Sequence, residues 1–189
     1  MTLVEVMVAL VIALIVIGIT STMLISGTQF FNKASSEVQD AEIARTVLNF
    51  TKSELRFATE IRSYIITSDR PNPKEGEGVL FAMNESGAAG AYNRGMIGFR
   101  RPDDKQLPAR NIFGKDFYHG RTVGIRIQCL DAEQPKVIKI FVDVFADNKL
   151  VATDSATIEV PNISNSSQPM AEHPSPPENH AYIIFSVLQ

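Results

Sequence analysis

The N-terminal segment constrains this chain most, because it is long, apolar and almost free of charge. Glu5 is the only charged side chain among the first 32 residues, and the first basic residue is Lys33. About 20 helical residues, each adding roughly 1.5 Å, cross a hydrocarbon core of roughly 30 Å. Residues 3–25 reach that length. We therefore expect a helix here that is able to cross a membrane.

Three interpretations of this segment compete. A cleavable signal peptide normally opens with basic residues, whereas this segment has none and carries an acid at position 5. A plain membrane anchor leaves Glu5 unexplained, because a carboxylate at a helix centre costs on the order of 3 kcal/mol and somewhat less near the interface. In the third interpretation, Glu5 has a charged partner supplied from outside its own chain.

The first ten residues, MTLVEVMVAL, resemble the mature N-terminus of type IV pilins and of type II secretion pseudopilins. In that family a prepilin peptidase removes a short basic leader and methylates the new N-terminal amine. The fifth residue is Glu, and the apolar helix first anchors the subunit and then packs in the filament core. The likeness covers about residues 1–60, and residues 44–58 are more weakly similar to minor pilins and the larger minor pseudopilins.

This resemblance implies roles for particular residues. Met1 would be the processed and methylated terminus, and Glu5 would pair with the N-terminal amine of a neighbouring subunit. The apolar side chains expected to pack in the filament core are Leu3, Val4, Val6, Val8, Leu10 and Ile12. The residues that weaken the helix, and around which we expect it to become irregular in the filament, are Gly18, Thr20, Thr22 and Gly27.

The resemblance also implies partners and a location. The partners would be copies of this chain or other pilins in a helical filament, the prepilin peptidase and the pilus assembly platform. The subunit would reside in the inner membrane before assembly and then in an extracellular or periplasmic filament. Adhesion, motility, DNA uptake and secretion all remain open as its role. A different class of function, a membrane-anchored extracytoplasmic binding module with a pilin-like N-terminus, is the alternative.

Beyond the apolar segment, the pattern predicts an α+β head with an antiparallel sheet. Apolar residues at helical spacing predict that the helix continues in amphipathic form over residues 29–64. Glycine and proline punctuate residues 65–120, which we expect to be rich in loops, with short strands at 78–83 and 96–100. Alternating patterns over residues 121–189 predict the antiparallel sheet, and Asp147 and Asn148 supply turn residues between two such runs, which predicts a hairpin. The expected division is thus an apolar helix, 1–28, and a head, 29–189.

The search for catalytic or metal-binding residues predicts no enzyme, no cofactor and no metal. His119, His173 and His180 lack a metal-binding spacing, and Cys129 alternates with apolar residues as a small core residue does. The aspartates weighed as calcium ligands match no EF-hand loop; they are Asp103, Asp104, Asp143 and Asp147.

Charge is distributed unevenly within the head. Residues 94–126 hold eight basic and three acidic side chains, a net +5, whereas residues 127–189 hold three basic and eight acidic, a net −5. These regions either bring neighbouring heads together or cancel within one head. The whole chain has a net charge of −3, so we do not expect nucleic acid as a partner.

Overall fold

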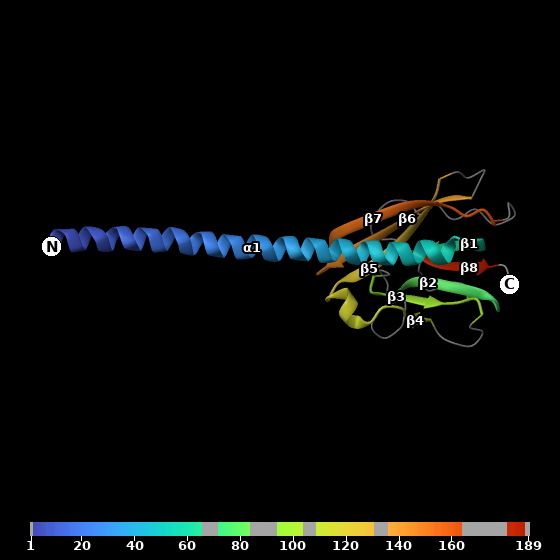
Figure 1. Cartoon of the computed structure of the whole chain (residues 1–189). Coiled ribbons are helices and arrows are strands. Elements are labelled where there is room, and N and C mark those ends of the chain that lie inside the picture. Colours follow the sequence, from blue (N-terminus) through green and yellow to red (C-terminus); the bar gives the residue numbers. More distant parts are fainter. Residues whose placement is uncertain are drawn as a thin grey trace. The chain divides into compact units, whose positions relative to one another are not determined.

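The fold is α+β, as the sequence predicts. The computed structural model describes residues 2–65, 72–83, 94–103, 109–130, 136–163 and 181–187. One helix, α1 (Leu3–Leu55), is followed by strands and by a short 3₁₀ helix, η1 (Lys115–Tyr118) (Figure 1). The strands are β1 (Ala58–Ile65), β2 (Glu77–Met83), β3 (Met96–Arg100), β4 (Arg110–Asn111), β5 (Thr122–Cys129), β6 (Val137–Ala146), β7 (Lys149–Glu159) and β8 (Ala181–Val187).

The chain divides into two compact units, Met1–Gln39 and Asp40–Gln189. The first unit consists of the N-terminal part of α1, and residues 2–33 are all exposed in it. The second contains the C-terminal part of α1 and every strand.

The strands of the second unit form two antiparallel sheets. The larger has the strand order β1-β8-β2-β3-β4, and the smaller has the order β5-β6-β7. Because β8 lies between β1 and β2, the last strand of the chain completes the larger sheet. A single backbone bridge between Gly95 and Val123 joins the entrance of β3 to β5.

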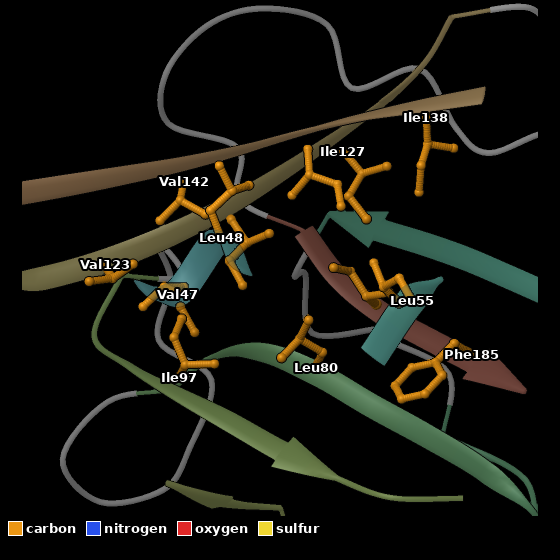
Figure 2. Close-up of a cluster of buried hydrophobic side chains, with 14 of the residues drawn as sticks. Val47, Leu48, Leu55, Leu80, Ile97, Val123, Ile127, Ile138, Val142 and Phe185 are labelled. Atoms are coloured by element: carbon orange, nitrogen blue, oxygen red, sulfur yellow. The ribbon is translucent and has the colours of Figure 1, made fainter. Parts of the chain in front are cut away.

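The main hydrophobic core lies where the last turns of α1 meet both sheets. Ala44, Leu48 and Leu55 are at most 4% exposed and lie on one face of the helix, since residues three, four or seven positions apart share a face. Val47, three positions after Ala44, is also fully buried. Side chains from β2, β3, β5, β6 and β8 converge on them (Figure 2). The other face of the larger sheet carries a second cluster of buried side chains from β2 and β8. Its members are Val79, Phe81, Met83, Tyr182 and Ile184. Both faces of β2 are therefore apolar.

The expectation that the helix runs to residue 64 is wrong, because α1 ends at Leu55 and residues 58–65 form strand β1. In β1, Ile61 lies opposite Phe185 of β8, and the Ile61 and Ser63 side chains face the same way and are buried. Phe57, which lies between the helix and the strand, is 64% exposed. Pairing with β8 satisfies the backbone of this segment and overrides its local helical spacing.

The sheet also begins earlier than expected, since β1 to β4 lie between residues 58 and 111. Of the region expected to be rich in loops, the short strands at 78–83 and 96–100 are confirmed as β2 and β3. The hairpin of β6 and β7 is confirmed as well. Its turn residues Asp147 and Asn148 both have positive φ, 47° and 64°, a conformation that Asp and Asn tolerate better than most residues.

Candidate assembly surface

The N-terminus of α1 is closed by a reciprocal pair of hydrogen bonds between Thr2 and Glu5. The Thr2 backbone N–H donates to Glu5 Oε2 at 2.7 Å, and the Glu5 backbone N–H donates to Thr2 Oγ1 at 3.4 Å. This is a capping box, in which two backbone donors that the helix leaves unpaired are satisfied. The helix dipole also favours a negative charge at this end. These two hydrogen bonds within the first turn therefore hold the Glu5 carboxylate at the N-terminus of the helix.

The apolar side chains assigned to filament packing have no partners within the described chain. Leu3, Val4, Val6, Val8, Leu10 and Ile12 are each 47–81% exposed. Met1, the expected site of methylation, lies outside the described residues. α1 is long and apolar enough to cross a membrane, and no part of its most apolar stretch is buried in the structure. Such a surface is stable only in lipid or against other apolar helices.

Removal of residues 1–28 is expected to yield a soluble, folded monomer, whereas the full chain is expected to need detergent or a filament. The reason is that the deleted segment carries most of the exposed apolar surface, while the first residue of the hydrophobic core is Ile43. Size-exclusion chromatography and circular dichroism of both proteins check this. A fragment that aggregates or lacks β-structure would show that the head does not fold independently.

The polar residues in the second half of the apolar segment are accommodated by local hydrogen bonds. Thr20 Oγ1 donates to the carbonyl oxygens of Val16 and Ile17, both at 3.0 Å, and Thr22 Oγ1 donates to the Ile19 carbonyl at 2.8 Å. These hydroxyls therefore need no external partner inside a membrane. In the single chain α1 is continuous through this region. Irregularity of this segment in a filament stays a prediction.

The double variant Gly18→Ala/Gly27→Ala is expected to strengthen the helix in this segment. No heavy atom lies within 4 Å of a Cβ placed at either glycine, so alanine fits in the single chain without a clash. Each substitution should favour the helix by roughly 1 kcal/mol. If assembly requires the segment to open, filament yield should fall while membrane abundance stays unchanged. Wild-type yield from this variant, measured in sheared fractions, would contradict the expected irregularity.

In the second unit, oppositely charged side chains are paired across long stretches of sequence. Arg126 of β5 donates two hydrogen bonds to Asp143 of β6, at 2.5 and 2.9 Å, and the Thr153 hydroxyl donates to the same carboxylate at 2.8 Å. Arg121 donates to Asp40 at 2.7 Å. The basic region 94–126 and the acidic region 127–189 therefore cancel in part within one head, through the Arg126–Asp143 pair. Sequence reasoning did not find these pairs, because no local pattern links their members.

The residues weighed for catalysis or metal binding are not brought together where the structure describes them. Among the described residues, no group of three His, Cys, Asp or Glu side chains is placed to hold a metal ion. Cys129 packs at the edge of the core, and Asp143 is engaged by Arg126. Asp103 and His119 are exposed, and Asp147 lies in the hairpin turn. His173, His180 and Asp104 lie outside the described residues.

Comparisons with protein families, curated proteins and solved structures give no match to this chain.

Proposed function

We propose that this chain is a structural subunit of a type IV pilus or of a type II secretion-like pseudopilus, which assembles through α1. The observation that carries the proposal is a capped helix end with a Glu5 carboxylate, followed by an apolar helical surface that is wholly exposed in the isolated chain. The second unit, which contains the end of α1 and the two sheets, follows on the same chain. This order of elements agrees with the N-terminal resemblance.

In the proposed assembly, Glu5 pairs with the N-terminal amine of a neighbouring subunit. Two unit charges about 4 Å apart gain about 4 kcal/mol at an effective dielectric constant near 20, which offsets much of the cost of burial. The first basic side chain of the same chain, Lys33, is roughly 40 Å away along a helix that rises about 1.5 Å per residue. Lys33 also lies 4.0 Å from Glu37, one turn further along. An amine from another subunit is therefore the favoured partner.

The exposed apolar surface of α1 suits both of the environments that the proposal requires, first the membrane and then the filament. Before assembly, the apolar helix lies in the inner membrane; after extraction, the helices of neighbouring subunits replace the lipid. Residues 2–33 lie outside the second unit and are exposed, so the exchange does not disturb the core of that unit. The work of the protein in this proposal is assembly, and the prepilin peptidase and the assembly platform act on it as partners.

Electron microscopy of sheared surface and periplasmic material, followed by mass spectrometry of the purified filaments, tests the proposal. We expect peptides of this chain in the filaments, with a methylated N-terminal residue. If the chain stays in the membrane fraction while filaments form without it, the proposal fails.

A membrane-anchored extracytoplasmic binding module is the second candidate, and one observation favours it. The second unit contains a cavity of about 230 Å³ next to η1. A binding module would keep its function as a single anchored copy, whereas a filament subunit would not. A Glu5→Ala variant that retains full function in the membrane would favour the module.

A further inference from the structure

Two adjacent phenylalanines lie where the apolar part of α1 ends. Phe30 and Phe31 are 76% and 72% exposed, and among the described residues only Leu3 is a more exposed large apolar side chain. Neighbouring residues of a helix project about 100° apart, so the two rings cover two faces of α1. Lys33, the first basic residue, follows two positions after Phe31. The two rings therefore mark the boundary between the apolar and the charged part of the helix.

The polar side chains that precede these phenylalanines do not prevent this part of α1 from lying in lipid. No charged side chain occurs between Glu5 and Lys33. Four hydroxyls in this stretch donate to a backbone carbonyl three or four positions earlier, at 2.8–3.0 Å; they belong to Thr20, Ser21, Thr22 and Thr28. A hydroxyl paired in this way needs no external partner in a membrane. The stretch that lipid can accommodate therefore extends to Phe31.

The length of this stretch matches the full thickness of a bilayer. At roughly 1.5 Å per residue, Phe31 lies about 39 Å from Glu5 along α1. The hydrocarbon core of a bilayer is roughly 30 Å thick, and the headgroup regions bring the total to about 40–45 Å. Glu5 and Phe31 are therefore far enough apart to lie in opposite headgroup regions at the same time.

The two phenylalanines also change the depth at which α1 is expected to lie. Without them the apolar stretch would be residues 3–25, whose middle is Leu14. Glu5 would then lie about 13–14 Å from the bilayer centre, inside a hydrocarbon layer with a half-thickness of roughly 15 Å. With them the stretch is 3–31, its middle is Ile17, and Glu5 lies about 18 Å from the centre. A carboxylate costs less free energy at this second depth, because it has left the hydrocarbon.

We propose that Phe30 and Phe31 bind the headgroup interface of a membrane and thereby hold the Glu5 carboxylate in the opposite interface. Aromatic side chains occur at membrane interfaces, Trp and Tyr in transmembrane segments and Phe on helices that lie in the interface. The inference rests on the membrane stage of the proposed function. It adds a depth for α1 and a lipid partner for these two side chains.

The depth of α1 can be measured with one introduced tryptophan, because the chain contains none. The full chain with Ile17→Trp is reconstituted in vesicles of phosphatidylcholine and phosphatidylglycerol. A part of the phosphatidylcholine carries a fluorescence-quenching nitroxide, either near the headgroup or near the end of an acyl chain. We expect the deep nitroxide to quench more strongly. Adding Phe30→Ala/Phe31→Ala should move this reporter about 4–5 Å away from the bilayer centre and increase quenching by the shallow nitroxide.

The matched control is Met23→Ala/Leu24→Ala in the same Ile17→Trp chain. It removes two apolar side chains that are each 70% exposed but lie within the hydrocarbon at the proposed depth, so the reporter should not move. An unchanged depth after loss of both phenylalanines would overturn the proposal. An equal shift in the control would overturn it too, because the depth would then depend on total apolar surface.

Two further single-tryptophan chains test the partner directly. In Phe30→Trp the shallow nitroxide should quench more strongly than the deep one. In Phe57→Trp, which replaces an exposed phenylalanine of the second unit, aqueous iodide should quench and neither lipid label should. If neither the lipid labels nor iodide quench Phe30→Trp, this side chain packs against a second chain and the proposal is overturned.

Failure of the inference and failure of the proposed function give different results. If no lipid label quenches Ile17→Trp, α1 does not lie in the membrane, and both fail. If the deep label quenches Ile17→Trp and its depth does not depend on Phe30 and Phe31, only the present inference fails. Neither measurement requires a filament.

Discussion

Replacement of Glu5 by alanine is expected to leave the head folded and the subunit in the membrane, while its incorporation into filaments falls sharply. The substitution removes the carboxylate proposed to pair with a neighbouring N-terminal amine, and the apolar helix that anchors the subunit stays intact. The readout is the amount of subunit in sheared fractions at equal membrane abundance. Incorporation at the wild-type level would refute the pairing.

Glu5→Gln is the matched control for the loss of the capping box. A glutamine at this helical position still accepts a hydrogen bond from the Thr2 backbone N–H, so the cap, worth about 1 kcal/mol, is retained while the charge is lost. We expect Glu5→Gln to assemble as poorly as Glu5→Ala. If glutamine restores incorporation, the cap and not the charge is what assembly needs. A subunit placed first, at the tip of a filament, has no earlier neighbour to dock against and would tolerate both changes. Normal incorporation of both variants would therefore indicate a tip subunit and not a subunit of the filament shaft.

Asp143→Ala is expected to destabilise the head by about 3 kcal/mol, the lower end of the range for breaking a buried ion pair. Asp143 is fully buried and accepts hydrogen bonds from Arg126 and Thr153, so its loss leaves both donors without their acceptor. The Arg126 side chain is 23% exposed, and the water that reaches it reduces the penalty. Denaturant unfolding of the fragment 29–189 measures the free energy of unfolding.

Glu37→Ala is the control for this measurement, because it breaks the Lys33–Glu37 pair, in which both side chains are more than two-thirds exposed. A pair of this kind on a helix surface is worth about 0.3–0.5 kcal/mol. Equal destabilisation by Asp143→Ala and Glu37→Ala would show that the buried pair does not hold β5 to β6.

The N-terminal helix, the fold class and the hairpin of β6 and β7 could be predicted from the sequence because their signals are local. A charge-free run of this length forms a helix in lipid whatever follows it, since every backbone group must be paired within the segment. Alternation with a period of two, closed by Asp147 and Asn148, specifies a hairpin within a few residues. The capping box could also be expected, because Thr2 and Glu5 are three residues apart.

The end of the helix and the walls of the cavity next to η1 depend on contacts between residues far apart in the chain. Residues 58–65 leave the helical pattern because β8, more than 115 residues later, supplies their hydrogen-bond partners. The same holds for Arg121, which finds Asp40 across 81 positions, and for Arg94, which stacks on Phe145 of β6. The local spacing of residues in the sequence does not reveal partners that are so far away in the chain. The sequence by itself determined the N-terminal helix and the hairpin of β6 and β7, in which backbone groups pair within one local segment. The tertiary structure decided the end of α1 and the pairing of β1 with β8, because burial and pairing between distant strands outweigh preferences of a few tenths of a kcal/mol per residue.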